Sequence, residues 1–234
     1  MRINSRLFGP AAPRRATLLA TLLIACLTLA AQACGGGEDG RDDGAGDTAP
    51  AVKTGVKPEP DSEVAVIDVV SAGGVNYGRL VIELYPNLAP KHVERFKTLV
   101  REGFYDGTAF HRVNPQAGVL QGGDPLSKDA NPANDGTGGS DYPDLEAEFS
   151  DVPFDRGIVG AARSSDPNSA NSQFYITLRR VPGWDRQYTV FGKVIQGMSD
   201  AQIMAGAPTR PGTENPAEPI RIQRAALRPR TEFQ

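Results

Sequence analysis

The sequence predicts a single mainly β domain, in which a closed or nearly closed antiparallel sheet is capped by helices. Three observations lead to this fold class. Short runs rich in β-branched and aromatic residues alternate with loops of Gly, Pro and Asn. Only two segments have helical character, and residues 62–229 have the length of one domain. Strand patterns alone do not separate a barrel from a sandwich, so both architectures remain open at this point.

The first expected elements are a β-hairpin and a helix. Residues 64–70 are rich in Val and Ile, and a glycine pair then offers a turn into a partner strand at 79–84. Two prolines precede a helix that ends at Gly103, and His92 on this helix is expected at the surface. The apolar residues of the helix fall at helical spacing and form one face: Val93, Phe96, Leu99 and Val100.

The remaining elements are short strands and one more helix. Loops rich in Gly, Pro and Asn separate the expected strands, which cover residues 110–113, 119–121, 158–162, 174–178 and 188–194. A brief helix near 199–204 precedes a last strand at 220–226, and the long loop 124–144 is expected on the surface. Residues 230–234 remain as a C-terminal tail.

The N-terminal segment has the layout of an export signal. Its first residues are basic without any acidic residue, and an apolar run covers residues 16–33. Small residues at Ala31 and Ala33 then offer a cleavage site. We therefore expect a signal peptide at residues 1–33. The alternative is an uncleaved transmembrane anchor, because the apolar run approaches the length that spans a bilayer.

Both cysteines of the chain, Cys26 and Cys34, lie at this leader, so a disulfide framework in the mature domain is not expected. A cysteine at the end of an apolar leader resembles the bacterial lipoprotein signal, in which the thiol is acylated. The residues before Cys26 fit that consensus better, yet we favour Cys34 because it ends the apolar run. Cleavage without lipidation is a further alternative. Residues 34–61, rich in Gly, Asp and Pro, are expected to be a flexible tether. The expected location is the cell envelope, with the protein anchored to a membrane through the lipid and facing the periplasm or the exterior.

Composition excludes several functional classes. The net charge is −3 and no basic tract occurs, whereas nucleic-acid binding needs clustered Lys and Arg. With two histidines and no cysteine beyond the leader, no zinc-ligand spacing occurs. A Ser-His-Asp hydrolase would have to use His111 as its base, and the Gly-x-Ser-x-Gly elbow is absent. We expect no metal and no cofactor, and we expect a monomer because nothing indicates an oligomer.

Three sequence blocks carry the functional prediction. Residues 110–113 read Phe-His-Arg-Val and are followed at 121–125 by Gln-Gly-Gly-Asp-Pro. Residues 172–176 read Ser-Gln-Phe-Tyr-Ile, and residues 188–192 read Tyr-Thr-Val-Phe-Gly. In order and spacing, these blocks resemble the cyclophilin family of peptidyl-prolyl cis/trans isomerases. The resemblance implies a closed eight-stranded antiparallel β-barrel with a helix covering each end.

Prolyl isomerisation suits this inventory because it needs no nucleophile, metal or cofactor. The barrier is amide resonance, about 18–20 kcal/mol. When the bond twists, the prolyl nitrogen regains a lone pair, and a fixed donor aimed at that lone pair stabilises the twisted state. Arginine stays protonated and presents several rigid N–H groups. By resemblance, Arg112 has the position of the catalytic arginine, and Gln121 that of the glutamine that orients it and the substrate carbonyl.

The resemblance also implies a set of substrate-binding residues. Strand alternation puts Val119 on the face of Gln121, and Gln173 on the face of Tyr175, and these are the faces that the family turns towards substrate. The alternate residues Phe110, Phe174 and Ile176 are therefore expected in the core. Ala162 and Arg163 stand where the family has an Ala-Asn pair, so only a main-chain role is expected to carry over. The full set of expected substrate-binding residues is Val119, Ala162, Arg163, Gln173, Tyr175, Trp184 and Tyr188.

The departures from the family pattern fall in the proline pocket. Gly118 stands where an aromatic wall is expected, and Val119 where methionine is common. Trp184 takes a leucine position with nothing bulky at the neighbouring tryptophan position, and Tyr188 replaces a histidine of some members. Our hypothesis is that Trp184 partly refills the space left open at Gly118. The alternative is that Trp184 is only a partly exposed loop residue.

Two functions from different classes of protein follow from these residues, and a third, a scaffold within an envelope complex, leaves no signature in the sequence. The first is an isomerase that acts on X-Pro bonds of exported proteins and assists their folding, with proline-containing polypeptides as partners. The second is a non-catalytic proline-peptide-binding or chaperone module of the cell envelope with reduced isomerase activity. Retention of Arg112, Gln121 and Gln173 favours the enzyme, whereas the altered proline pocket favours the binding module.

Overall fold

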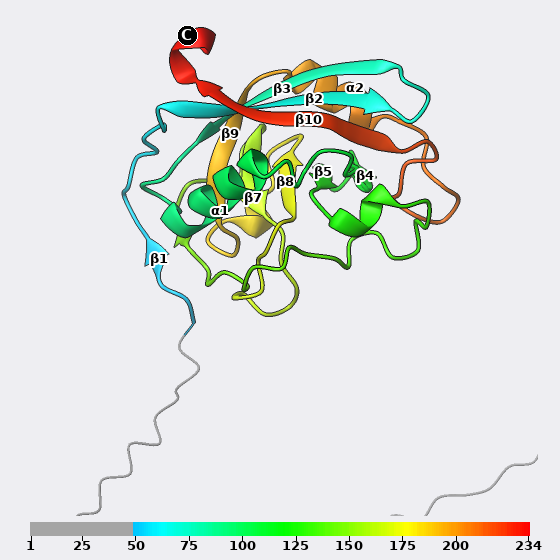
Figure 1. Ribbon diagram of the computed structural model, residues 1–234. Helices are drawn as coiled ribbons and strands as arrows, with labels where there is room; N and C mark the ends of the chain where they lie inside the picture. Colours follow the sequence, from blue (N-terminus) through cyan, green and yellow to red (C-terminus); the bar gives the residue numbers. More distant parts are fainter. Residues whose placement is uncertain (1–48) are drawn as a thin grey trace, which may run out of the picture. The chain divides into compact units, whose positions relative to one another are not determined.

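Ten strands and two α-helices make up the part of the chain that the computed structural model describes, residues 49–234 (Figure 1). The strands are β1 (Val52–Lys53), β2 (Glu63–Ser71), β3 (Asn76–Leu84), β4 (Arg112–Asn114), β5 (Val119–Gly122), β6 (Phe149–Ser150), β7 (Ile158–Ala161), β8 (Phe174–Thr177), β9 (Val190–Gln196) and β10 (Ile220–Pro229). The α-helices are α1 (Pro90–Arg101) and α2 (Met198–Ala205). Three 3₁₀ helices, η1 (Pro125–Lys128), η2 (Pro182–Trp184) and η3 (Arg230–Phe233), complete the set of elements.

Eight of the strands form one antiparallel sheet in the order β10-β2-β3-β9-β7-β8-β5-β4. The prediction of an eight-stranded antiparallel fold with two helices is therefore confirmed. The prediction of closure was too strong, because β10 and β4 at the two ends of the sheet do not form a ladder. Residues just before β4 bridge the gap instead, since the N–H of Phe110 donates to the carbonyl of Ile220 at 2.8 Å. Further along β4 an irregular segment takes over, and the N–H of Val113 donates to the carbonyl of Glu214 at 2.8 Å.

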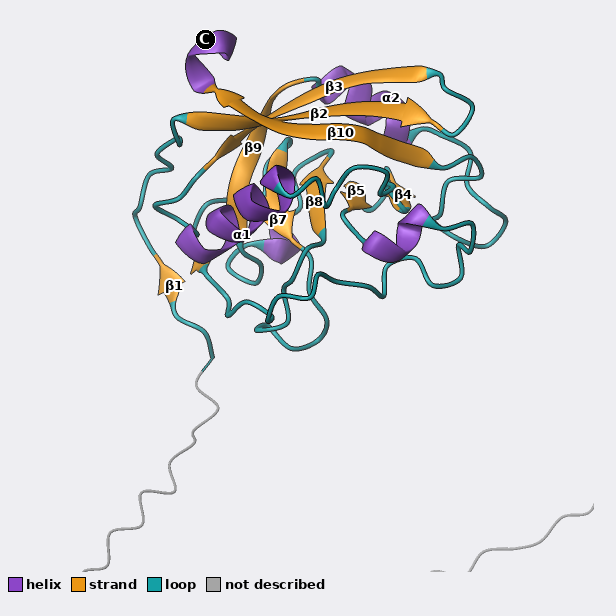
Figure 2. Ribbon diagram, viewed as in Figure 1, coloured by secondary structure: helices purple, strands orange, loops and turns teal. Residues whose placement is uncertain are grey.

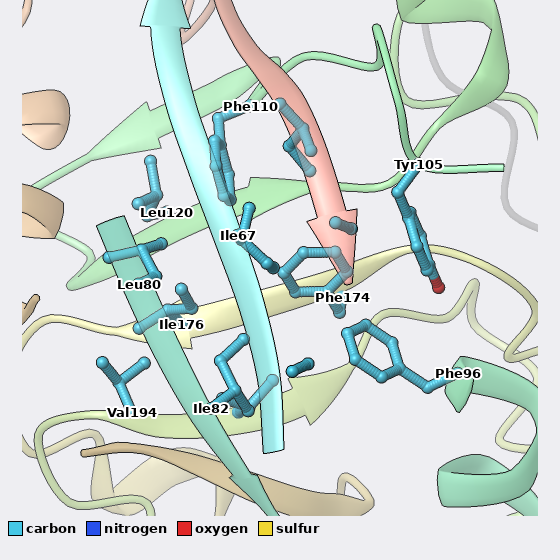
Figure 3. Close-up of a cluster of buried hydrophobic side chains, with 14 of the residues drawn as sticks. Ile67, Leu80, Ile82, Phe96, Tyr105, Phe110, Leu120, Phe174, Ile176 and Val194 are labelled. Atoms are coloured by element: carbon cyan, nitrogen blue, oxygen red, sulfur yellow. The ribbon is translucent and has the colours of Figure 1, made fainter. Parts of the chain in front are cut away.

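The core lies on the inner face of this curved sheet (Figures 2 and 3). Phe110, Phe174 and Ile176 are all buried there, as their strand positions predicted. Aromatic rings from α1 and the sheet meet edge to face, with the ring centroids of Phe96 and Phe174 5.5 Å apart. α1 packs against β9 and β10, whereas α2 packs against β3, β4 and β5, so the two helices cover different parts of the sheet.

The beginning of α1 is held by a residue distant in sequence. The helix has no side-chain cap of its own, although Pro90 suits its first turn. The carboxylate of Glu148 accepts the backbone N–H of Lys91 at 3.3 Å and that of His92 at 3.1 Å. It also lies 2.8 Å from Nδ1 of His92, whose side chain is therefore turned inward. The expectation that His92 lies at the surface was wrong, because the residue is only 5% exposed.

The folded part of the chain begins before the boundary at residue 62 that composition predicted. β1 pairs in parallel with β6, and Nζ of Lys53 donates to the carbonyl of Leu88 at 2.7 Å. Nζ of Lys97 lies 2.7 Å from the carboxylate of Asp61. Apolar residues are sparse over 34–61, which predicted a tether, whereas residues 49–61 attach to the fold mainly through backbone and charged groups, with Val56 packing on a core cluster. The expected signal peptide, the first part of the tether and both cysteines lie outside the described residues.

The C-terminal residues also join the fold. Residues expected as a tail form η3, and Phe233 packs against Val64, Val66 and Val81 on the outer face of the sheet. Nε of Arg230 donates to Glu83 at 2.8 Å. Within residues 49–234, no helix combines the length and the apolar character that crossing a membrane requires.

Candidate active site

A row of side chains crosses the sheet where the sequence placed its catalytic residues. Arg112 of β4 lies opposite Gln121 of β5, and Gln121 lies opposite Tyr175 of β8. Tyr175 in turn lies opposite Gly160 of β7, and the missing side chain at Gly160 leaves room for the tyrosine ring. Directly opposed residues project from the same face of a sheet. The row therefore places a cation, an amide and an aromatic ring side by side on the outer face.

A chain of hydrogen bonds orients the two catalytic candidates. Nη1 of Arg112 donates to Oε1 of Gln121 at 3.4 Å, and Nε2 of Gln121 donates to Oε1 of Gln173 at 3.0 Å. Nε2 of Gln173 donates to the carbonyls of Gly136 and Gly138 at 3.0 and 2.9 Å. Because carbonyls only accept, they fix which end of each amide faces Arg112. The long loop at 124–144 therefore fixes the end of this series of hydrogen bonds.

A carboxylate that the sequence did not indicate holds the other side of Arg112. Nε of Arg112 donates to Oε2 of Glu214, and Nδ2 of Asn114 donates to Oε1 of the same carboxylate. Burial alone would raise the pKa of Glu214, but the bonds from Arg112 and Asn114 and the charge of Arg112 outweigh it and lower the pKa below its usual value. Glu214 is therefore an anion that pairs with the arginine.

An aromatic cluster lies beside this polar row, with Tyr175 buried and Trp184 and Tyr188 half-buried. The ring centroids of Tyr175 and Trp184 are 4.9 Å apart, and those of Trp184 and Tyr188 are 5.8 Å apart. Val119 is fully buried in the same cluster, and the buried Phe154 packs against Tyr175. Burial raises the pKa of the Tyr175 phenol well above its ordinary value, so this side chain stays neutral. The structure thus brings Val119, Tyr175, Trp184 and Tyr188 together in one cluster, and their role in substrate binding stays a prediction.

The position beside Gly118 differs from our hypothesis for Trp184. A side chain added at position 118 would first meet atoms of Arg179. Nε of Arg179 donates to the carbonyl of Gln116 at 3.1 Å, and this bond holds the arginine beside Gly118. Gly118 has a φ of +82°, a conformation that favours glycine over an aromatic residue. Arg179, rather than Trp184, therefore occupies the space beside Gly118. Trp184 is half-buried against Tyr175 and so is more than a loose loop residue.

Comparison with known proteins agrees with this geometry. The family model described as cyclophilin type peptidyl-prolyl cis-trans isomerase/CLD matches residues 67–227. The chain belongs to the cyclophilin family.

Its relatives include bacterial and eukaryotic cyclophilins. The chain is 49% identical over 152 residues to a probable peptidyl-prolyl cis-trans isomerase of Brucella suis. This match covers 63% of this chain and 74% of the relative. It is 38% identical over 151 residues to the isomerase ppi1 of Schizosaccharomyces pombe, which covers 63% of this chain and 92% of the relative. A crystal structure of a Cryptosporidium parvum cyclophilin, determined in the presence of the dipeptide Ala-Pro, matches with a TM-score of 0.60 and 28% identity. That match covers 70% of this chain and 98% of the other.

A groove of about 540 Å³ adjoins the polar row of this cyclophilin domain. Gln121, Gln173, Ala162 and Arg163 line it together with the glycine-rich stretch 136–139. The N–H of Ala162 is bonded to the carbonyl of Gln173 at 3.0 Å, which leaves the Ala162 carbonyl as its free main-chain group among the described residues. The groove is lined mainly by polar groups, so it suits the backbone of an extended peptide better than an apolar side chain.

Arg163 has a larger part in this cyclophilin site than its main chain alone. Its guanidinium lies 4.4 Å from the centre of the Tyr188 ring. Nη2 donates to the carbonyl of Gln187 at 3.0 Å, and Nη1 donates to that of Ser164 at 2.8 Å. The side chain therefore ties the groove to the aromatic cluster, which the expectation of a main-chain role alone did not include.

The titratable residue next to Arg112 in the chain is His111, which is buried. Burial lowers the pKa of His111, although Asp124 opposes this shift, so the imidazole stays neutral at pH 7. No three His, Cys, Asp or Glu residues within 49–234 gather closely enough to hold a metal ion. The residue of this site that the sequence did not indicate is Glu214, which lies in an irregular loop without any motif.

Proposed function

We propose that this chain catalyses the cis/trans isomerisation of X-Pro peptide bonds. The observation that carries the proposal is the row formed by Arg112, Gln121 and Tyr175, in which a fixed cation lies beside an aromatic cluster. Uncatalysed X-Pro bonds isomerise in tens to hundreds of seconds, which is slow enough to limit folding. A site that stabilises the twisted amide therefore has a substrate in any folding chain that contains proline. The crystallisation of a related cyclophilin in the presence of Ala-Pro supports the same substrate class.

The mechanism follows from where each group lies. The proline ring packs on the half-buried ring of Trp184, which rests on the buried Tyr175, and this contact fixes one side of the amide while the other side rotates. As the bond twists, the prolyl nitrogen becomes pyramidal, and a guanidinium N–H of Arg112 donates to its lone pair. This bond is stronger in the twisted state than in the planar one, which is the condition for catalysis. Gln121 forms a hydrogen bond with the substrate backbone. Its amide does not need to reorient for this bond, because the contact with Gln173 already fixes it.

The test is exchange NMR on an X-Pro peptide with the wild-type protein and an Arg112→Ala variant. We expect exchange much faster than in buffer, and a loss of about a hundredfold or more in the variant, the size typical for a missing electrostatic donor. Arg224→Ala is the matched control, because Arg224 is an exposed arginine of β10 that lies outside the row. Wild-type exchange no faster than in buffer would contradict the proposal. Peptide binding without exchange would instead support a non-catalytic binding module.

The finer proposal is that the substrates are exported proteins and that the chain is anchored to a membrane through a lipid on Cys34. It is supported by the basic and apolar leader that precedes this cysteine. Metabolic labelling with a radioactive fatty acid tests it in cells that express the wild type, Cys34→Ser or Cys26→Ser. We expect label in the wild type and in Cys26→Ser, and none in Cys34→Ser. No label in any of the three contradicts the lipid anchor, and label that persists in Cys34→Ser contradicts Cys34 as its site.

A further inference from the structure

Glu214 reaches the site because an irregular segment fills the gap between β10 and β4. The carbonyl of Glu214 accepts the N–H of Val113 at 2.8 Å, so its backbone runs alongside β4. Two further bonds turn the segment tightly, from the N–H of Arg210 to the carbonyl of Asn215 at 2.9 Å and from the N–H of Thr213 to the carbonyl of Arg210 at 3.0 Å. The position of the Glu214 backbone is therefore determined on both sides.

The carboxylate is held as firmly as the backbone. One oxygen accepts from Nε of Arg112, and the other accepts from Nδ2 of Asn114. Asn114 is itself fixed, because its Oδ1 accepts the N–H of Ala117 at 2.7 Å. An acceptor in a fixed place imposes a direction on the group that donates to it. Here that group is the Nε edge of the catalytic arginine.

This contact decides which edge of Arg112 remains for the substrate. Nε donates to Glu214 and Nη1 to Gln121, whereas Nη2 has no hydrogen-bond partner among residues 49–234. The guanidinium is planar, so fixing Nε and Nη1 also fixes the direction of Nη2. Apart from Glu214, Arg112 has only the long contact of 3.4 Å to Gln121 within the described part of the chain, and its side chain is 41% exposed even with Glu214 in place. Without Glu214, such a side chain would spread over several rotamers.

We propose that Glu214 is the positioning residue of this isomerase, which holds the Nε edge of Arg112 so that Nη2 points at the prolyl amide. The proposal rests on the proposed isomerase function and adds a residue to it. Glu214 does not touch the substrate, and it does not supply positive potential, since a carboxylate partly offsets the charge of the arginine. Its contribution is the direction of the donor. The conformational entropy of Arg112 is therefore lost when the protein folds rather than during the reaction.

Orientation and charge make opposite predictions for two substitutions. Glu214→Gln keeps one oxygen that accepts from Nε but removes the negative charge and the second acceptor, to which Asn114 donates. Glu214→Ala removes both the oxygen and the charge. If the carboxylate acts by position, we expect kcat to stay within about threefold in Glu214→Gln and to fall about tenfold in Glu214→Ala. The KM for an X-Pro peptide should stay within about twofold in both, because the donor acts mainly in the twisted state.

The matched control is Glu218→Ala, which removes a carboxylate from the same segment. Glu218 accepts the N–H of Gly73 and lies away from Arg112, so kcat should not change. The thermal unfolding midpoint of each variant separates a positioning role from a structural one, since an exposed ion pair contributes little stability. We expect the midpoints of Glu214→Ala and Glu214→Gln to lie close to that of the wild type.

The decisive readouts are kcat from exchange NMR and the side-chain Nε–Hε signal of Arg112. The signal should move in Glu214→Ala and stay in Glu218→Ala, whether or not the protein is active. A kcat in Glu214→Ala within twofold of the wild type would overturn the positioning role, and so would a kcat that rises in both variants. An unmoved Nε–Hε signal would overturn the contact itself. Absence of wild-type exchange with a moved signal would contradict the isomerase function rather than the contact.

Discussion

Gln121 and Gln173 share a hydrogen bond of 3.0 Å from Nε2 of the first to Oε1 of the second, although they are 52 residues apart. Because Gln173 also donates to the carbonyls of Gly136 and Gly138, its Oε1 can only face Gln121. The Gln121 amide is thereby fixed with its oxygen towards Arg112. The polarity of the whole row is decided by two backbone carbonyls of a surface loop.

The first prediction concerns this chain of amides. Gln121→Leu keeps the size of the side chain but removes its acceptor for Arg112, so kcat/KM for an X-Pro peptide should fall by about tenfold to a hundredfold. Gln173→Leu should cost less, because Gln173 acts through Gln121. Exchange NMR measures both, with Gln202→Leu on the exposed face of α2 as the control. Equal activity in Gln121→Leu and the wild type would show that Arg112 needs no partner on this side.

The second prediction concerns the aromatic surface. Trp184 packs on Tyr175 and Tyr188, so Trp184→Ala should weaken the binding of an X-Pro peptide by about tenfold through the lost apolar contact. Trp184→Phe should retain most of the affinity because it keeps a ring. Trp184 is the only tryptophan of the chain, so its fluorescence reports peptide binding in the wild type directly. Calorimetry gives the affinities of the variants, and an unchanged affinity in Trp184→Ala would remove Trp184 from the site.

Much of the fold could be predicted because local sequence patterns decide it. The expected strand at 64–70 is β2 (Glu63–Ser71), and the expected helix near 199–204 is α2 (Met198–Ala205). The two-residue strands β1 and β6 could not be predicted, because they pair across almost a hundred residues and have no apolar pattern. Closure of the sheet was overestimated for a similar reason, since the irregular segment around Glu214 takes the place of a ladder along β4.

The site divides in the same way. Arg112, Gln121, Gln173 and Tyr175 lie in contiguous blocks, and strand alternation places them on one face, so their association could be predicted. Glu214 lies 102 residues from Arg112 in a segment without periodicity, and its role depends on how that loop turns. Arg179 beside Gly118 is another case, because a long side chain from a neighbouring strand end reaches a space that the sequence left open. The contacts of long polar side chains on irregular backbone could not be predicted, because no sequence periodicity fixes where such side chains point.

The third prediction concerns the segment before β2. A protein that starts at Ala49 should be more stable than one that starts at Ser62, because the shorter chain lacks Asp61 and β1. Nζ of Lys97 is largely buried and would keep only its contact with Glu63 at 2.9 Å. We expect a loss of about 2 kcal/mol and a melting temperature about 4–8 °C lower. Thermal unfolding followed by circular dichroism measures it, with Asp68→Ala in the longer protein as a control for an exposed ion pair. Equal melting temperatures would mean that the segment is only attached, not stabilising.

The last prediction concerns the pH dependence of stability through Glu148. This carboxylate accepts two backbone N–H groups at the start of α1 and lies beside Nδ1 of His92. Burial alone would raise the pKa of Glu148, but the bonds from His92 and Lys91 outweigh it and lower the pKa below the ordinary value of 4.5. A carboxylate with a lowered pKa stabilises the folded state above its ordinary pKa, and this stability is lost as the pH falls through the lowered value.

Glu148→Gln should therefore destabilise the protein by about 1 kcal/mol at pH 7, where the charged cap is lost. The difference between wild type and variant should shrink as the pH falls below 4.5, the ordinary value for a glutamate, because the wild-type carboxylate is then being neutralised as well. Urea unfolding at pH 7 and at successively lower pH measures both quantities. Glu146→Gln is the control, because its carboxylate is mostly exposed and pairs only with the side chain of Lys91, so its effect should be close to zero at every pH. A difference between wild type and Glu148→Gln that stays constant down to the lowest pH at which the protein folds would show that Glu148 contributes shape rather than charge at the start of α1.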